Sequence, residues 1–379
     1  MKLPILFPLS VCAAFLLSGC GGGSTPDSSE VPDGSTPDAP SVPAKPAPEP
    51  DDADSVTALK AVATSMRQND HGQIIEVNFR ESEATDEAMQ HLAGLRAVES
   101  ILLNDVEITD AALEPIGKLE TLKNLDLRGC PVSNDGLAHL IGLKNLKALR
   151  LNGKSGATLV DDLGFEHIAK LPALKVLNAD FLFGDIVAAI NHLEGVDGLE
   201  ELYLAGTTFD DEAAKLLGQF PKLKTLRVSQ TQISDLGLEH LAALKSLEKL
   251  DLSENSQIFD GGLMHLSGMT QLKWLNLWRV AISDLGVMHL AGLTNLEWLN
   301  LDNTQLSDSG LPHLAEMTNL TFLHLGSTFI SDAGLEHLHP LTSLKDLKVT
   351  RTGVSEAGVE SLEKVLTNTD IQLKYIEGL

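Results

Sequence analysis

The sequence is poor in aromatic residues and in cysteine, and each shortage narrows what the protein can be. Only 4% of its 379 residues are aromatic while 43% are hydrophobic, so we expect a core of aliphatic side chains, chiefly leucine. The three cysteines are Cys12, Cys20 and Cys130. Because the first two lie close to the start of the chain, Cys130 is the single thiol of the expected folded part, and an internal disulfide is excluded there.

Basic residues are outnumbered almost two to one by acidic residues. Lys and Arg total 28 and Asp and Glu total 53, which gives a formal net charge of -25. Recognition of nucleic acid or of an anionic membrane by a basic face needs the opposite balance, so we expect no nucleic-acid partner. The charge is compatible with a basic partner, with divalent cations, or with a solvated surface that has no charged partner.

Signatures of catalysis are also missing. No G-x-S-x-G, H-E-x-x-H or Cys–His arrangement occurs, so we predict that the chain is not an enzyme. Residues 148–155, A-L-R-L-N-G-K-S, fit a loose form of a phosphate-binding loop. Leu149 and Leu151, however, alternate as the inward residues of a strand do, whereas a phosphate cradle needs a free glycine-rich loop. We therefore expect no nucleotide, metal or other cofactor.

The first twenty residues have the composition of a targeting segment. Met1-Lys2 precedes an apolar stretch, residues 3–17, that is too short for a comfortable membrane span, and Leu17-Ser18-Gly19-Cys20 follows. This arrangement resembles the lipobox of bacterial lipoproteins, in which the cysteine is acylated and becomes the mature N-terminus. The resemblance implies a signal peptide over residues 1–19, lipidation at Cys20, and membrane contact through that lipid alone. The alternative is an ordinary secretory signal that is cleaved nearby.

The same resemblance carries an expectation about location. Residue 21 is Gly rather than Asp, which in well-studied bacteria with two membranes favours the outer membrane. We therefore expect a lipid-anchored protein of the cell envelope whose folded part lies outside the cytoplasm.

A tether and a capping helix are predicted before the main domain. Eight of the sixteen prolines fall between residues 21 and 50, among Gly, Ser and Asp, so residues 20–54 should form an extended, flexible tether. Residues 55–66 carry apolar side chains at helical spacing, at positions 56, 59, 62, 63 and 66. We interpret residues 55–73 as an N-terminal capping helix.

Residues 74–379 repeat themselves with a period near 24. The shared pattern is L-x-x-L-x-L-x-x-T-x-I-S-D-x-G-L-x-H-L-x-x-L, and its second leucine, or a substitute, recurs at positions 77, 101, 125, 149, 177, 202, 226, 250, 275, 299, 323, 347 and 373. The L-x-L alternation predicts a short strand with its leucines inward. Ser234-Asp235 and its equivalents predict a helix N-cap with an acid in the first turn.

The pattern resembles leucine-rich repeats, and its 24-residue form with a Gly-Leu helix looks like the ribonuclease-inhibitor-like or GALA-type class. The resemblance implies an α/β solenoid, a curved right-handed β-α superhelix with parallel strands on the concave side and helices on the convex side. Thr231, Thr304, Thr328 and Cys130 occupy the place where many members carry Asn. A buried Thr there is expected to bond to the turn of the neighbouring repeat. GALA-type effectors carry an F-box segment ahead of their repeats; this chain has none, so no ubiquitin-ligase role is implied.

Two further features modify the repeat. The step from position 149 to 177 is 28 residues, so an insertion near residues 153–162 should protrude as a loop, and a tolerated surface insertion is favoured over a functional one. Seven histidines recur before an inward helix residue, at positions 139, 167, 240, 265, 289, 313 and 337. Because neighbouring helices should lie about 9–10 Å apart, we interpret them as repeat positions and not as a metal site.

The predicted concave face carries the candidate binding site. The third, fifth, seventh and eighth residues of L-x-x-L-x-L-x-x should point away from the core, and all three tryptophans fall on such positions. Three rings at the third position should lie side by side at a strand spacing of about 5 Å. The candidate ligand-binding residues are Trp274, Asn276, Trp278, Arg279, Trp298, Asn300, Phe322 and His324.

Three functions remain open for this aromatic surface. The favoured one is a protein-binding module displayed on the cell surface, because Trp, Tyr and Arg dominate protein interfaces. The second is recognition of carbohydrate or cell wall, in which the rings stack on sugars. The third is a structural envelope protein that associates with itself through the tryptophans. The alternative to a binding function is that the aromatic pairs only stabilise the sheet.

Overall fold

The L-x-L alternation forms one short strand in each repeat, because it places two leucines on the same side of an extended chain. The computed structural model describes residues 48–374, so the expected signal peptide, Cys20 and most of the tether lie outside the described residues. The strands within residues 48–374 form one open sheet in sequence order, with β1 antiparallel to β2 and every later neighbour parallel. They are β1 Ser65–Gln68, β2 Ile74–Asn78, β3 Ser100–Leu102, β4 Asn124–Asp126, β5 Ala148–Asn152, β6 Val176–Asp180, β7 Glu201–Tyr203, β8 Thr225–Arg227, β9 Lys249–Asp251, β10 Trp274–Asn276, β11 Trp298–Asn300, β12 Phe322–His324, β13 Asp346–Lys348 and β14 Asp370–Gln372.

A short helix follows almost every strand. The α-helices are α1 Ala53–Val62, α2 Asp86–Met89, α3 Asp110–Ile116, α4 Asn134–Ala138, α5 Phe165–Ile168, α6 Ile186–His192, α7 Asp211–Leu216, α8 Asp235–Leu241, α9 Asp260–Leu263, α10 Asp284–Val287 and α11 Glu356–Glu363. The 3₁₀ helices are η1 Gln90–Gly94, η2 His139–Gly142, η3 Asp162–Gly164, η4 Leu217–Gln219, η5 Met264–Leu266, η6 Met288–Leu290, η7 Leu311–Leu314 and η8 Leu335–Leu338.

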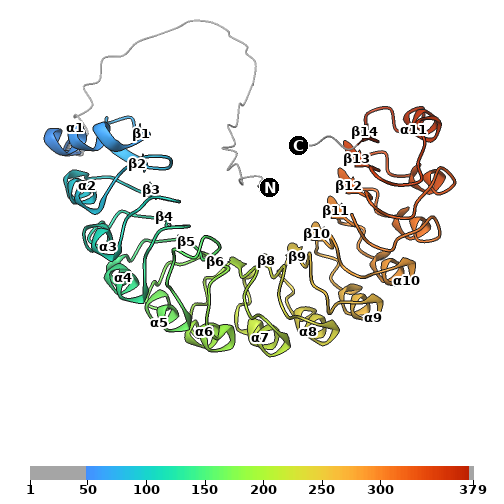
Figure 1. Cartoon of the computed structure of the whole chain (residues 1–379), viewed down its shortest axis with the longest axis horizontal. Coiled ribbons are helices and arrows are strands. Elements are labelled where there is room, and N and C mark those ends of the chain that lie inside the picture. Colours follow the sequence, from blue (N-terminus) through green and yellow to red (C-terminus); the bar gives the residue numbers. More distant parts are fainter. Residues whose placement is uncertain (1–47, 375–379) are drawn as a thin grey trace, which may run out of the picture. The chain divides into compact units, whose positions relative to one another are not determined.

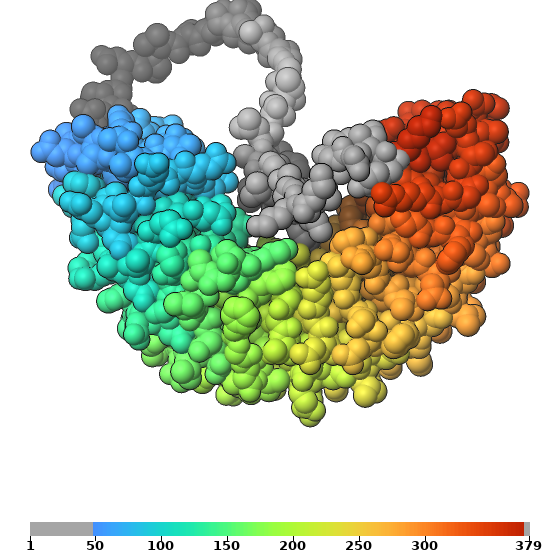
Figure 2. Space-filling view, in the orientation of Figure 1, coloured from blue at the N-terminus to red at the C-terminus, as the bar shows by residue number. Residues whose placement is uncertain are grey.

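Within the unit that spans Glu49–Tyr375, the strands line the inner side of a curve and the helices form its outer side (Figure 1). Leucines from both sides meet between the two layers and are fully buried, as at Leu275 and Leu290. Successive repeats lie against one another along the face seen in Figure 2. Their buried side chains form one continuous core. The predicted solenoid is therefore confirmed.

The folded part begins earlier than the sequence predicted, and its cap contains a strand. The Asp51 carboxylate accepts hydrogen bonds from the backbone N–H of Ile74 and of Arg96, at 2.6 and 2.7 Å, so this residue belongs to the fold and not to the tether. Helix α1 ends at Val62, whereas we predicted a capping helix over residues 55–73. The following residues instead form β1, which pairs with β2 and covers the first edge of the sheet.

Two smaller predictions also need correction. The last strand aligns Ile371 with Leu347, so the thirteenth strand position is 371 and not 373. The insertion protrudes only briefly: residues 154–156 and Leu159 are exposed, but Thr158 is buried, with its hydroxyl within hydrogen-bond distance of the carbonyls of Cys130 and Asn152. These contacts hold the end of the loop against the stacked repeats, so the protruding part is only a few residues long.

Two of the predicted threonines bond within their own repeat, whereas Thr231 also contacts the Asn255 side chain of the next repeat. The hydroxyl of Thr304 donates to the carbonyl of Leu301 at 2.8 Å, and Thr328 does the same to Leu325 at 2.6 Å. The predicted bond to a neighbouring repeat is made instead by Asn255, whose amide donates to Leu252 and, across the repeat boundary, to Val228. A threonine hydroxyl has a single proton to donate, whereas an asparagine amide has two.

An aspartate and a serine join many helix starts to the next, a contact we call the Asp–Ser staple. An Asp at the start of one helix, or in the turn before it, accepts with its two carboxylate oxygens the backbone N–H and the hydroxyl of the Ser at the same place in the next repeat. For Asp260 and Ser283 both distances are 2.6 Å. The staples are Asp110–Ser133, Asp211–Ser234, Asp260–Ser283, Asp284–Ser307, Asp308–Ser331 and Asp332–Ser355, with Asp86–Thr109 as a variant.

The staple also explains the glycine of the S-D-x-G pattern. A Cβ placed on Gly286 would lie 2.5 Å from Asp260 Oδ1 and 3.1 Å from the Asp260 Cα. The glycines at the same position of other repeats meet the preceding aspartate in the same way, as Gly237 does with Asp211. Glycine is therefore needed for close approach of neighbouring helix starts, and not for an unusual backbone angle.

The staple yields a prediction about stability. Asp260→Ala should lower the free energy of unfolding by about 2 kcal/mol, because two hydrogen bonds to a charged group are lost. Gly286→Ala should lower it by about 1–3 kcal/mol through the clash with the same carboxylate. The double variant should lose less than the sum, because Asp260→Ala removes the atom that the new Cβ strikes. Urea unfolding measures all three, and additive losses would contradict this account.

Candidate functional site

Three of the predicted aromatic residues, Trp274, Trp298 and Phe322, lie on the consecutive strands β10, β11 and β12. The sheet register pairs Trp274 with Trp298 and Trp298 with Phe322, so the three rings share one row across the strands. The side-by-side arrangement expected from the 24-residue spacing is confirmed. We call these three residues the aromatic row.

The rings of the aromatic row are stacked face to face. The centroids of Trp274 and Trp298 are 4.2 Å apart with planes inclined by 13°, and those of Trp298 and Phe322 are 4.8 Å apart with planes inclined by 4°. All three side chains are consequently half-buried, although we expected exposed rings. Both faces of Trp298 are covered by its neighbours, so the row presents ring edges to a ligand.

The other predicted residues surround the row and are held by specific contacts. The Arg279 guanidinium carbon lies 5.3 Å from the centroid of the Trp278 ring, and Arg279 forms an ion pair with Glu254 at 3.1 Å. The Asn276 side chain accepts the backbone N–H of Trp278 and donates to Asp251. Asn300 accepts the backbone N–H of Asp302. Arg279 is exposed, whereas both asparagines and Trp278 are half-buried.

Arg279 lies at a turn that recurs at the end of the strands. Its φ is +56°, and non-glycine residues with similar positive φ values recur at the same place in other repeats, such as Asn303 and Arg351. In this left-handed conformation the chain turns away from the strand, and the Arg279 N–H donates to the carbonyl of Asp302 in the next repeat. The sequence pattern did not predict this turn, because glycine, the residue typical of a positive φ, occupies this position in only some repeats.

His324 closes the row on one side. Its ring meets Phe322 edge to face, with centroids 6.4 Å apart, and its Nε2 lies 4.0 Å from an oxygen of Asp302. Burial, together with the positive charge of Lys348, lowers the pKa of His324 from 6.5 to about 4. Burial also raises the pKa of the Asp302 carboxyl, while hydrogen bonds from the side chains of Ser327 and Trp278 oppose that rise.

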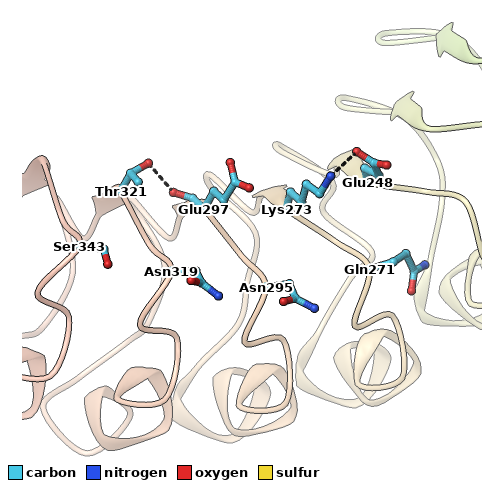
Figure 3. A pocket seen from close by; sticks show the side chains of 8 residues that line it. All are labelled: Glu248, Gln271, Lys273, Asn295, Glu297, Asn319, Thr321 and Ser343. Carbon is cyan, nitrogen blue, oxygen red and sulfur yellow. Dashed lines mark hydrogen bonds and ion pairs between the residues drawn. The ribbon is translucent and has the colours of Figure 1, made fainter. Parts of the chain in front are cut away.

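A shallow groove borders the aromatic row at the start of the strands (Figure 3). Lys273, Glu297 and Thr321 immediately precede the three rings and line this groove. A second line of polar side chains lies toward the helices, where the amides of Asn295 and Asn319 donate to backbone carbonyls of the preceding repeat. The complete lining is Glu248, Gln271, Lys273, Asn295, Glu297, Asn319, Thr321 and Ser343.

The sequence did not reveal a charged cluster in the middle of the inner face. Arg227 lies between Asp180 and Asp251, at 3.2 and 3.4 Å, and both carboxylates are buried. Burial raises the pKa of both carboxyls, and the guanidinium of Arg227 opposes the rise. The three residues stand on different repeats, on β6, β8 and β9, so only the stacking brings them together. Tyr203, on β7, donates to Glu201 and takes no part in the aromatic row.

The histidine column shows no metal geometry. No group of three or more His, Cys, Asp or Glu side chains within residues 48–374 is placed to hold a metal ion. The histidines of the column are half-buried, except the exposed His139. His167 Nδ1 is buried without a hydrogen-bond partner in the described part of the chain. Cys130 is fully buried, and its thiol donates to the carbonyl of Leu103 at 3.0 Å.

Comparison with known proteins agrees with this architecture. A sequence model described as a leucine-rich repeat matches residues 118–140 and 221–242. These two stretches match leucine-rich repeats, and the solenoid is similar to those of solved leucine-rich-repeat proteins. Such repeats generally serve as protein–protein interaction modules and are typically not enzymes. A search of curated protein sequences found no match.

Two solved structures share the fold. An internalin from Listeria monocytogenes is 20% identical, with a TM-score of 0.57, over 86% of this chain and 96% of that one. A leucine-rich-repeat protein from Leptospira interrogans is 18% identical, with a TM-score of 0.50, over 75% of this chain and 80% of that one. At these identities the likeness extends to the solenoid and not to the surface of the inner face. No helix within residues 48–374 is long and apolar enough to cross a bilayer.

The low pKa of His324 gives a prediction about acid stability. The folded state resists protonation of His324 down to about pH 4, whereas the unfolded chain takes up the proton near pH 6.5. This group therefore contributes stability that is present above pH 6.5 and is lost as the pH falls toward 4. Relative to His324→Gln, the native chain should lose about 2–3 kcal/mol between these limits. Urea unfolding at several pH values measures the difference, and an equal pH dependence in both proteins would contradict it.

Proposed function

We propose that the chain is a non-enzymatic binding module that holds a protein partner on the inner face of its C-terminal half. The observation that carries this proposal is the aromatic row, a set of three stacked rings fixed on neighbouring strands. A rigid aromatic cluster loses little conformational entropy on binding, which is one reason why aromatic residues dominate protein interfaces. The polar residues around the row, Asn300 and Arg279 among them, supply hydrogen-bonding groups at its border.

The ring geometry favours a polypeptide over a sugar. A pyranose ring stacks on an aromatic face, but both faces of Trp298 are occupied by Trp274 and Phe322. The edges that remain are the electropositive part of an aromatic ring, and they suit carbonyl oxygens, carboxylates and the faces of other aromatic rings. Peptides offer all three groups. Recognition of carbohydrate or cell wall therefore ranks second.

Affinity capture with the full chain tests the binding role. The native chain should enrich a set of proteins that the Trp274→Ala/Trp298→Ala variant loses, because the variant lacks two of the three rings. Phe329→Ala is the matched control, since this aromatic side chain is 73% exposed and lies outside the aromatic row. The proteins that the control retains and the tryptophan variant loses are the partners. Identical protein sets from all three baits would contradict the proposal.

Two further measurements separate the alternatives. A glycan array should show no binding that depends on Trp298; a tryptophan-dependent glycan signal would favour the second function. Trp298→Ala should lower the free energy of unfolding by about 1–3 kcal/mol, because the contacts with both stacked neighbours are lost. Urea unfolding checks that the variant remains folded. A loss of binding can then be assigned to the surface and not to unfolding.

We also propose that the module is anchored by a lipid on Cys20 and displayed from the outer membrane of a cell envelope. The support is the Leu17-Ser18-Gly19-Cys20 motif after an apolar segment, followed by a proline-rich stretch. Metabolic labelling with an alkyne-tagged fatty acid should mark the native chain and not a Cys20→Ser variant. A label that persists in Cys20→Ser would overturn the lipidation site, and fractionation of the membranes tests the location.

A further inference from the structure

A cluster of exposed apolar side chains lies on the outer side of the array, away from the aromatic row. Helices α8, α9 and α10 lie side by side there, together with η5 and η6 (Figure 1). Five large apolar side chains on these three repeats are between 45% and 66% exposed: Leu236, Phe259, Met264, Leu285 and Met288. We call them the outer apolar patch.

The repeat geometry makes these side chains neighbours. Met264 and Met288 occupy the same position in successive repeats. Leu285 and Met288 are three residues apart along α10 and η6, so they share one helical face. The Phe259 backbone N–H donates to Asp235 at 2.8 Å, which places Phe259 beside the start of α8, where Leu236 lies.

The patch ends where the neighbouring repeats begin. The positions of Leu236 and Met264 are held by Glu212 and Lys215 in the repeat before it, and by Ser309 and Pro312 in the repeat after it. Single exposed apolar residues are ordinary on protein surfaces, but a bounded cluster on three adjacent helices is typical of an interaction site. Methionine and leucine side chains are adaptable and common on surfaces that bind amphipathic segments.

The charges around the patch define the partner that fits it. Residues 235–241, 260–266 and 284–290 carry four carboxylates, those of Asp235, Glu239, Asp260 and Asp284, and no lysine or arginine. The three aspartates accept hydrogen bonds from the next repeat, but these donors are neutral, so the negative charge remains. A second copy of the chain, with a net charge of -25, would bring the same acidic rim and be repelled. An anionic membrane would be repelled for the same reason.

We propose that the outer apolar patch is a second docking surface, which binds a cationic amphipathic polypeptide segment. The apolar side chains of the segment cover Leu285, Met288 and their neighbours, while its lysines or arginines face the carboxylates of the rim. This surface is independent of the aromatic row, which lies on the opposite layer of the solenoid. The chain can therefore hold two polypeptides at once.

Three synthetic helical peptides test the chemistry of this surface on the full chain. One has leucines on one face and lysines on the other, the second replaces the lysines with glutamates, and the third replaces the leucines with serines. Fluorescence anisotropy should show binding of the leucine–lysine peptide and affinities at least about tenfold lower for the other two, because each lacks one of the two complementary features. Equal affinities for the lysine and glutamate peptides, or no binding at all, would overturn the proposal.

Variants place the binding on the protein. Leu285→Ser/Met288→Ser should lower the affinity for the leucine–lysine peptide about tenfold without changing the charge of the chain, and Glu239→Lys should also weaken it. Phe329→Ser changes a more exposed apolar residue outside the patch, and this variant should bind like the native chain. Trp298→Ala should also leave this affinity unchanged, which distinguishes the outer surface from the aromatic row. A loss in Phe329→Ser as large as in the patch variant would show non-specific adsorption and refute the proposal.

Discussion

The stacking of each repeat on the next is the constraint on which the rest of the structure depends. A single repeat has one strand and one short helix, and neither can bury its apolar side without a neighbour. Two sets of hydrogen bonds hold the neighbours in place: the backbone bonds between parallel strands on the inner side and the Asp–Ser staples at the helix starts. The staple needs a carboxylate, a hydroxyl and a glycine at fixed positions, such as Asp260, Ser283 and Gly286. Because these positions lie in successive repeats, consecutive staples require the same number of residues between one helix start and the next.

The same constraint shapes both candidate binding surfaces. On the inner side, residues of equal repeat position are brought to the strand spacing, and this spacing is close enough for three aromatic rings to stack. On the outer side the side chains of Met264 and Met288, although they occupy the same position in successive repeats, remain exposed. One array therefore offers a tightly packed row on its inner side and a looser apolar patch on its outer side. The spacing of the strands and of the helices sets how closely side chains of equal repeat position can pack on each side.

Much of the fold could be predicted from the sequence, because the 24-residue pattern of leucines, serines and aspartates marks the strand and the helix of each repeat. The strands, the N-cap serines and the row formed by Trp274, Trp298 and Phe322 depend on positions within one 24-residue unit, and a periodic sequence shows these plainly. The partner of the aspartate was missed: we assigned the acid only to its own helix, and the contact with the next serine appears once two repeats are stacked. The ends were also misjudged. Strand β1 is antiparallel and has no counterpart in the repeat, so no comparison between repeats could predict it.

Contacts between repeats account for the remaining surprises at the sites. The ion pairs of Arg227 join residues about 25 to 50 positions apart, and no local pattern marks them. The half-burial of the rings was missed for a similar reason, since each ring is covered by the next one and not by the core. The aromatic row was found because tryptophan is rare in this chain, whereas the outer apolar patch was missed because its leucines stand among the many leucines of the repeat.

The register of the sheet has a consequence for the shape of a ligand on the inner face. Successive rings of the aromatic row are separated by 4.2 and 4.8 Å. An extended peptide returns a side chain to the same face only every 6.6–6.8 Å or so, and it would fall out of step within two rings. An α-helix advances about 5.4 Å per turn, so a helix laid across the strands keeps roughly one turn above each ring. The ring spacing on the inner face is thus closer to the pitch of an α-helix than to the two-residue repeat of an extended strand.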